Sequence, residues 1–177
     1  MTTANPRESP QMPFGKSVFY NLRYSGTSST ERLNWRRENL QHLCDEHIFV
    51  CLSELRNSQA VVDSLLVSQV STHMAFYHCE TGLPGQVILI QRSWAAQAVI
   101  GAQEGERRTW SHAVLVQGCA HMVWWLEGSV VKAVVNLYLD SHSPALRVRQ
   151  LKALAAAIRD FKHSMTEGHR FEFIFWG

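Results

Sequence analysis

His47-Ile-Phe-Val-Cys-Leu52 is a short apolar run rich in β-branched and aromatic side chains, which is typical of a buried strand. It directly follows a helix expected over residues 31–46, where Leu33, Leu40 and Cys44 fall along one side. Another strand is expected before that helix, over residues 17–22. Two strands joined by one helix of this length pair in parallel, so an α/β fold is expected.

Strands and helices continue to alternate outside this unit. Thr30 closes a polar loop and is expected to cap the helix over 31–46. Further helices are expected over 58–69 and 144–163, and further strands over 73–79, 86–91, 112–117, 122–126 and 130–139, with a hairpin turn at 127–129. In the last helix an apolar stripe is expected to face a sheet (Leu151, Leu154, Ile158, Phe161) while basic residues stay exposed (Arg149, Lys152, Arg159, Lys162).

The chain ends on Phe171-Glu-Phe-Ile-Phe-Trp-Gly177, a segment whose aromatic content predicts a buried strand. Its glycine suits a tight turn after that strand. Soluble domains usually end in a polar tail at the surface. A terminus made of core strand therefore indicates a fragment of a longer domain.

Composition fits one folded domain. Hydrophobic residues make up 46% of the chain, which is enough for a sizeable core. The net charge of +2 is too small to demand a nucleic-acid or anionic-membrane partner. No run approaches the ~20 apolar residues that span a bilayer. Residues 1–13 contain three prolines among polar residues and lack the apolar stretch of a signal peptide, so we expect a disordered N-terminal tail there and a domain over 14–177.

The four cysteines, at positions 44, 51, 79 and 119, have no C-x-x-C spacing, so a zinc site is not expected. Their apolar surroundings favour reduced core thiols. Reduced thiols are typical of an intracellular protein, either nuclear or cytoplasmic.

Three polar residues lie where predicted strands end, which is where α/β folds place their chemistry. They are Asn21, Glu54 and Tyr138. Taken singly, Asn21 would be a turn residue, Glu54 a surface carboxylate and Tyr138 an amphipathic core aromatic with a wet hydroxyl. Their order along the chain is what makes them candidates for one site.

In this order the motifs resemble the endonuclease/exonuclease/phosphatase superfamily, which includes deoxyribonuclease I, apurinic/apyrimidinic endonucleases and the endonucleases of LINE-type retrotransposons. Phe19-Tyr-Asn-Leu-Arg23 resembles its opening strand ending in Asn, and Ile48–Glu54 resembles its strand ending in Gln-Glu, with Ser53 in place of Gln. Gly85–Ile90 is similar to its Gly-Gly-Val-Ala-Ile-Leu strand, and Val135–Leu139 to its segment with a catalytic Tyr. Residues 171–177 resemble the strand that enters its Gly-Asp-Phe-Asn loop.

The resemblance implies a partial four-layer α/β sandwich of deoxyribonuclease I type, with mixed sheets and flanking helices, truncated before the Gly-Asp-Phe-Asn loop. It implies a metal-dependent phosphodiesterase, most simply a DNA endonuclease of retroelement type. Glu54 would hold Mg²⁺ or Mn²⁺, which prefer carboxylate and water ligands. Asn21 would position phosphate or nucleophile, and Tyr138 would support the phosphate in the transition state. The loop Asp and the His of a Ser-Asp-His motif that activate water in the family lie outside these 177 residues, so this chain alone is expected to be inactive.

Other candidate residues have two interpretations each. His142 and Asp140, beside Tyr138, would contact phosphate or merely end a strand. Trp94 or Trp110 would stack on a base or pack in the core. The basic residues of the last helix would follow a phosphate backbone or form an ordinary solvated face.

Two other functions stay open. One is a phosphatase or sphingomyelinase that acts on a small phosphoester. The other is a non-catalytic remnant that serves as a binding or interaction domain, which Ser53 in place of Gln and the missing loop favour.

Overall fold

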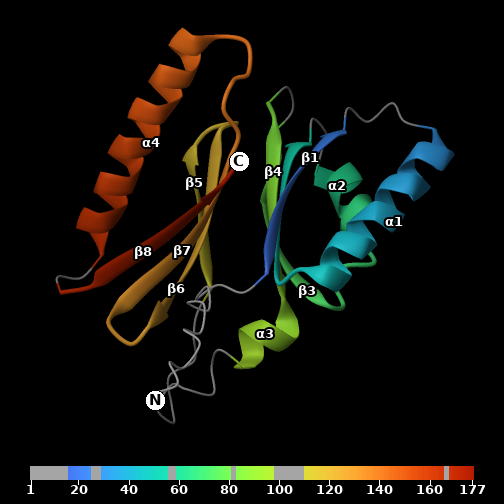
Figure 1. Cartoon of the computed structure of the whole chain (residues 1–177), viewed down its shortest axis with the longest axis horizontal. Helices are drawn as coiled ribbons and strands as arrows, with labels where there is room; N and C mark the ends of the chain where they lie inside the picture. The colour runs from blue at the N-terminus through green and yellow to red at the C-terminus, as the bar shows by residue number, and fades with distance from the viewer. Residues whose placement is uncertain (1–15, 25–28, 56–58, 81–82, 98–109, 166–167) are drawn as a thin grey trace, which may run out of the picture.

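The computed structural model describes residues 16–24, 29–55, 59–80, 83–97, 110–165 and 168–177 (Figure 1). The tail expected over residues 1–13 lies outside these residues. The order of elements is β1 Ser17–Tyr24, α1 Thr30–Glu46, β2 Phe49–Leu55, α2 Gln59–Leu66, β3 His73–His78, β4 Gly85–Gln91, α3 Arg92–Gln97, β5 Ser111–Val116, β6 Ala120–Glu127, β7 Val130–Leu137, α4 Pro144–Ser164 and β8 Arg170–Trp176.

These strands form two four-stranded mixed sheets, with the orders β1-β2-β4-β3 and β5-β6-β7-β8. The parallel pairing of β1 with β2 is confirmed, since Ser17 pairs with Phe49 and Asn21 with Ser53. The hairpin of β6 and β7 around residues 127–129 is confirmed as well. β7 and β8 form a second parallel pair, joined by α4.

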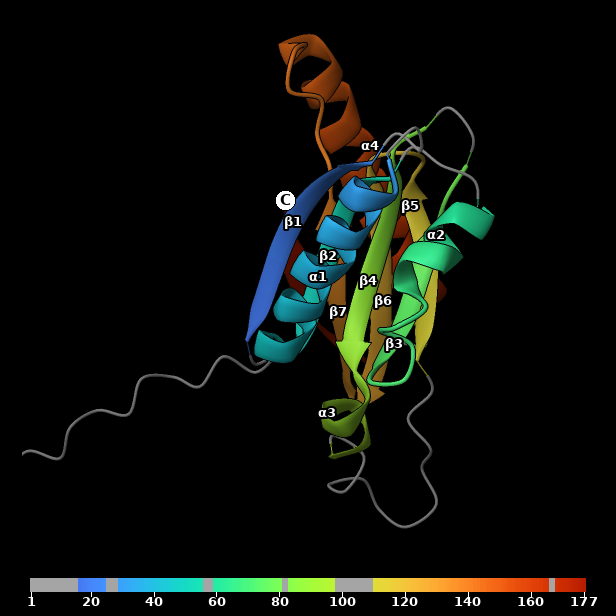
Figure 2. The same ribbon diagram turned by 90° about the vertical axis from the view of Figure 1, so that its right-hand side faces the viewer.

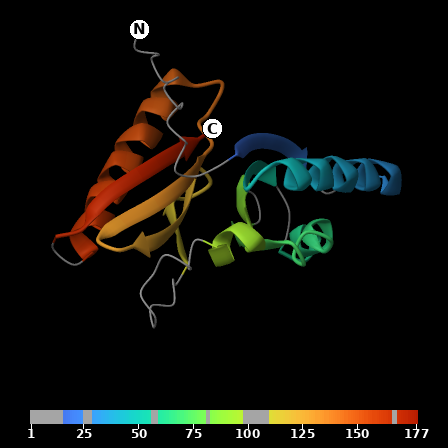
Figure 3. The same cartoon turned by 60° about the horizontal axis from the view of Figure 1, so that its bottom comes forward.

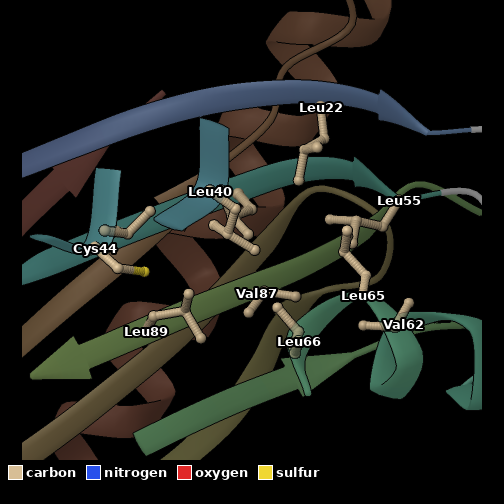
Figure 4. Packing of buried hydrophobic residues seen from close by; sticks show 11 residues of the cluster. Leu22, Leu40, Cys44, Leu55, Val62, Leu65, Leu66, Val87 and Leu89 are labelled. Carbon is tan, nitrogen blue, oxygen red and sulfur yellow. The ribbon is translucent and has the colours of Figure 1, made fainter. Parts of the chain in front are cut away.

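The two sheets lie face to face between helices, which gives four layers (Figures 1 and 3). Each pair of adjacent layers encloses its own apolar cluster. The cluster between α1, α2 and the first sheet includes Leu40, Leu52 and Leu65 (Figure 4), and the one between the sheets includes Phe49 and Trp125. α4 covers the second sheet through a third cluster. The expected sandwich with mixed sheets and flanking helices is therefore confirmed.

The helices differ from the expected ones mainly at their ends. Ser29, rather than Thr30, caps α1, because its side chain accepts a hydrogen bond from the Arg32 amide. α2 ends at Leu66 instead of residue 69, and the short helix α3 was not predicted. No helix in the described part of the chain combines the length and apolarity needed to cross a membrane.

The last strand, β8, is less buried than the sequence predicted. Most of its side chains are half-buried, and Phe175 is 47% exposed. The reason is its position at the edge of the sheet, where among the described residues it pairs with β7 alone. Phe171, Phe173 and Phe175 stack in a row on the α4 side of the strand, while Ile174 and Trp176 pack between the sheets.

The apolar stripe of α4 is also shorter than expected. Leu154, Ile158 and Phe161 pack on the second sheet, but Leu151 is 45% exposed, so that part of the prediction is wrong. The first turns of α4 project beyond the ends of the strands (Figure 2), and the α4 side chains of the third cluster begin at Leu154. The basic residues of α4 are exposed as predicted: Arg149, Lys152, Arg159 and Lys162.

The four cysteines are free thiols, with Cys44, Cys51 and Cys119 buried and Cys79 half-buried. Burial, helped by the nearby charge of Asp45, raises the pKa of Cys44 to about 12. Burial also raises the pKa of Cys79 and of Cys119, each to about 11. These groups are therefore protonated at neutral pH and behave as small apolar side chains, as expected.

Two buried amide side chains, Gln86 and Asn136, connect the sheets at the end where β2 and β7 finish. Asn136 Nδ2 donates to Leu52 O at 2.7 Å and to Val87 O at 3.0 Å, which ties β7 to β2 and β4. Gln86 Nε2 donates in the opposite direction, to Cys119 O and Asn136 O, both at 3.0 Å. We call this pair the amide clamp.

His121 is buried between the sheets at the same end, opposite Asn136 in the β6–β7 register. Its Nε2 lies 3.2 Å from His112 Nδ1. Burial, with smaller contributions from the charges of His112 and His78, lowers the pKa of His121 to about 3. His121 is therefore neutral at physiological pH.

Replacing Asn136 with Ala is expected to lower the free energy of unfolding by about 2–4 kcal/mol, because two buried carbonyls lose their donor and a small cavity forms. Urea unfolding measures this loss. Asn34→Ala, on the exposed side of α1, is the matched control and should change the value by less than about 0.5 kcal/mol. Equal stability of the two variants would contradict a role for the clamp.

His121 is expected to make stability fall with acidification. Between pH 6.5 and about 3 the unfolded chain protonates this group and the folded chain does not, so stability is complete above pH 6.5 and decreases below it. The limiting slope is about 1.4 kcal/mol per pH unit. Urea unfolding of His121→Gln at pH 7, 6 and 5 should show a weaker pH dependence, whereas His163→Gln, on exposed α4, should match the unchanged chain.

Candidate active site

The carboxyl end of β2 is irregular at the point where Glu54 lies. Leu52 and Leu55 both belong to the cluster under α1 and α2, although three residues apart they would face opposite ways in a regular strand. The pairing of β2 shifts register in this interval with both neighbours, β1 and β4. Glu54 itself has a φ of 59°, and it is the one non-glycine residue with positive φ in the described part of the chain. The β-bulge redirects the Glu54 side chain.

Tyr138 contacts the redirected carboxylate of Glu54. It follows β7 directly, and its amide donates to Cys119 O at 2.7 Å, which fixes the backbone. Its hydroxyl donates to Glu54 Oε1 across the two sheets. Both side chains are half-buried. The structure thus brings together two of the predicted site residues, which are 84 positions apart in sequence.

Asn21 lies at the same end of the first sheet. It pairs with Ser53, the neighbour of Glu54, on the strand next to β2. Phe19 and Cys51, two residues earlier in each strand, pack between the sheets, so Asn21 and Ser53 face the second sheet. Asn21, Glu54 and Tyr138 therefore share one end of the sandwich, as their predicted strand ends required.

His142 is placed differently from these three residues. Its side chain is exposed, and its amide donates to Asp140 Oδ1 at 2.9 Å. Asp140 also accepts from the Ser143 amide, and Arg147 donates to the carbonyls of Asp140 and Ser141. The Ser143 and His142 amides and the charges of His142 and Arg147 lower the pKa of Asp140. Asp140 therefore serves to hold the turn into α4.

The donors at this site suit a hard cation. Mg²⁺ binds proteins through one or two carboxylates and keeps several waters, so Glu54 with a neighbouring amide and phenol fits its chemistry. No group of three or more His, Cys, Asp or Glu side chains within the described residues could hold a metal by itself. Any ion here would depend on Glu54, water and substrate oxygens.

The other predicted candidates lie elsewhere. Trp94 and Trp110 pack against each other and against Trp125, with Trp94 also on Phe49 at 4.9 Å. Phe49 begins β2 and Glu54 is near its end, so these rings lie at the far end of the sandwich from the site. They are part of the inter-sheet core, not a base-stacking surface beside Glu54.

Sequence reasoning missed the backbone constraint at Gly177. A Cβ on this residue would lie 2.0 Å from Leu137 O, so only glycine fits there. The end of β8 thus runs tightly past the end of β7, next to Tyr138. This steric limit is one reason for the glycine, beside the turn that the sequence predicts. The amide clamp was also missed, and its one sequence signal is polar Gln86 and Asn136 within otherwise apolar strands.

Comparison with known proteins gives structural but not sequence relatives. No protein-family model and no curated protein sequence matches the chain. The AP endonuclease LMAP from Leishmania major aligns over 90% of this chain with a TM-score of 0.56 and 13% identity, and a humanized D. rerio TDP2 aligns over 90% with 0.56 and 14%. The 3′-5′ exonuclease NExo from Neisseria meningitidis aligns over 90% with 0.50 and 15%.

The matched region spans 54%, 63% and 56% of those three chains, so this chain corresponds to little more than half of each. Identities this low establish the fold alone. The strand orders, the four layers and these neighbours agree with one another. The chain shares the fold of these AP endonuclease, TDP2 and exonuclease structures, the type of fold that the resemblance implied, and corresponds to part of their length.

Proposed function

We propose that this chain provides one half of the active site of a metal-dependent phosphodiesterase that acts on DNA, of retroelement endonuclease type. The observation that supports it is the contact of Tyr138 with Glu54 across the two sheets, with Asn21 on the adjacent strand. This arrangement occurs in a fold shared with an AP endonuclease, TDP2 and a 3′-5′ exonuclease.

Each residue has a task that follows from its chemistry. A phosphodiester is anionic, so its hydrolysis needs positive charge and hydrogen-bond donors directed at its oxygens. Glu54 would hold Mg²⁺, which when bound neutralises phosphate charge. The Tyr138 hydroxyl orients the Glu54 carboxylate and is a donor that can turn to a phosphate oxygen. Asn21, beside Ser53, offers an amide donor for the same phosphate.

DNA is the substrate class that the structural neighbours favour. A D. rerio TDP2 structure holds a single-strand DNA product, and a NExo structure holds a product DNA hairpin. The short spacing from Asn21 to Glu54 and from Glu54 to Tyr138 is the feature that favours a retroelement type.

A DNA phosphatase is the second candidate. One structure of this fold is described as the 3′ phosphatase NExo, so the same scaffold carries out reactions on phosphate monoesters. Glu54, Asn21 and Tyr138 would serve a monoester and a diester alike, because each acts on charge or on phosphate oxygens. Product analysis separates the two: nicked strands report a diesterase, and free phosphate reports a phosphatase.

Glu54→Gln is expected to weaken Mn²⁺ binding at least about 10-fold, because a neutral amide replaces the Glu54 carboxylate. Tyr138→Phe, which loses only an orienting contact, should weaken it by about 10-fold or less. Isothermal titration calorimetry measures both. Glu38→Gln on exposed α1 is the control. Absence of Mn²⁺ binding to the unchanged chain would favour a non-catalytic interaction domain.

The 177-residue chain alone is expected not to hydrolyse DNA above background with Mg²⁺. Acid–base groups and positioned charges each contribute ~10²-fold or more, and Glu54 supplies few of them. Two assays test this: nicking of plasmid DNA and release of phosphate from a 3′-phosphorylated hairpin. Each assay compares the 177-residue chain with a longer chain that also carries a Gly-Asp-Phe-Asn loop and a Ser-Asp-His motif. Nicking by the 177-residue chain that Glu54→Ala abolishes would show instead that its site is complete.

A further inference from the structure

The flank of the sandwich formed by β3 and β5 brings histidines from both sheets into the gap between them (Figure 2). On β6, His121 faces this gap, because Val123, two residues later, packs between the sheets. On β3, His78 faces it for the same reason, two residues after Phe76. His112 joins them from β5, with its ring against that of Phe76. This flank is distinct from the candidate active site, whose residues come from β1, β2 and the end of β7.

Two of these imidazoles are held with ring nitrogens facing each other. His112 Nδ1 lies 3.2 Å from His121 Nε2, and the two ring planes are nearly perpendicular, at 86°. Burial fixes the His121 ring, and Phe76, at 5.7 Å between ring centroids, supports the more exposed His112 ring from the other sheet. A hydrogen shared between these nitrogens accounts for the distance when nothing else binds there.

The surroundings of His121 favour one tautomer. Its Nδ1 is buried without a partner in the described part of the chain, and so is Asn136 Oδ1, on the residue directly opposite in the β6–β7 register. An N–H at Nδ1 is the donor that this neighbouring acceptor lacks. The lone pair of His121 then lies on Nε2, directed toward His112. Burial keeps this ring neutral, since it lowers the pKa of His121 to about 3.

We propose that His112 Nδ1 and His121 Nε2 together bind one Zn²⁺ ion, with water completing its coordination. Zn–N bonds of about 2.0–2.1 Å at a tetrahedral angle place two ligand nitrogens about 3.3–3.4 Å apart, close to the 3.2 Å observed. Imidazole suits Zn²⁺, whereas Mg²⁺ prefers oxygen ligands. The protein supplies two ligands, since no group of three His, Cys, Asp or Glu side chains among the described residues could hold a metal. His78 is not one of them, because its Nε2 is engaged by the Gln117 amide at 3.0 Å.

Zinc binding replaces the shared hydrogen and leaves one hydrogen on each neutral ring. His121 keeps its hydrogen on Nδ1, and His112 carries its own on Nε2. The ion connects β5 to β6 through residues nine positions apart in sequence, which the unfolded chain does not hold together. Zinc therefore stabilises the folded chain. Neither residue belongs to the proposed phosphodiesterase site, so this inference does not depend on that function.

Titration calorimetry of the 177-residue chain with ZnCl₂, in excess Mg²⁺ to saturate oxygen-ligand sites, is expected to show one tight site. His112→Gln should weaken this binding at least about 10-fold, because a direct ligand is lost. His42→Gln, at an exposed histidine on α1, is the matched control and should leave it unchanged. Absence of zinc binding, or equal affinity of His112→Gln and the unchanged chain, overturns the proposal.

Stability and ring chemistry give a second, independent test. Saturating Zn²⁺ should raise the urea midpoint of the unchanged chain and leave that of His112→Gln in place, while the two unfold alike without zinc. Imidazole ¹⁵N spectra are expected to show zinc-induced shifts at His112 Nδ1 and His121 Nε2, with the His121 hydrogen on Nδ1. Zinc shifts confined to other histidines, or an equal midpoint increase in His112→Gln, would contradict this site.

Discussion

The amide clamp of Gln86 and Asn136 fixes how the two sheets meet at the end that carries the site. Apolar packing between sheets is non-directional and tolerates small slides. The four hydrogen bonds of the clamp do not tolerate such slides, because each joins a side chain to one particular backbone carbonyl. Asn136 holds Leu52, two residues before Glu54, and itself lies two residues before Tyr138. The distance between these two functional groups is therefore set by a buried polar contact rather than by the apolar core.

Local backbone strain at Glu54 also helps to position its side chain. A regular β2 would direct Glu54 toward α1 and α2, because Leu52 faces that way. The bulge and the positive φ of Glu54 turn it toward the other sheet, at a cost of roughly 1–3 kcal/mol for such a conformation. The Tyr138 hydroxyl and the flanking buried Leu52 and Leu55 hold it there. Strain retained at a carboxylate is typical of functional sites, where a side chain must be aimed before substrate arrives.

The features that depend on the periodicity of apolar residues could be predicted from the sequence. The β1–α1–β2 unit, the β6–β7 hairpin and the basic face of α4 all follow from patterns over several residues. Asn21, Glu54 and Tyr138 could be placed at one end because parallel strands end together. The clamp, the bulge and the exposure of Leu151 could not be predicted. Each depends on contacts between segments far apart in sequence, such as Asn136 with Leu52, or on how far α4 projects past the sheet.

The flank formed by β1 and β8 reaches the end of the sandwich that carries the site. β1 carries Asn21, and β8 ends at Gly177, which lies tightly against Leu137 beside Tyr138. Whatever occupies the β8 edge therefore borders the site.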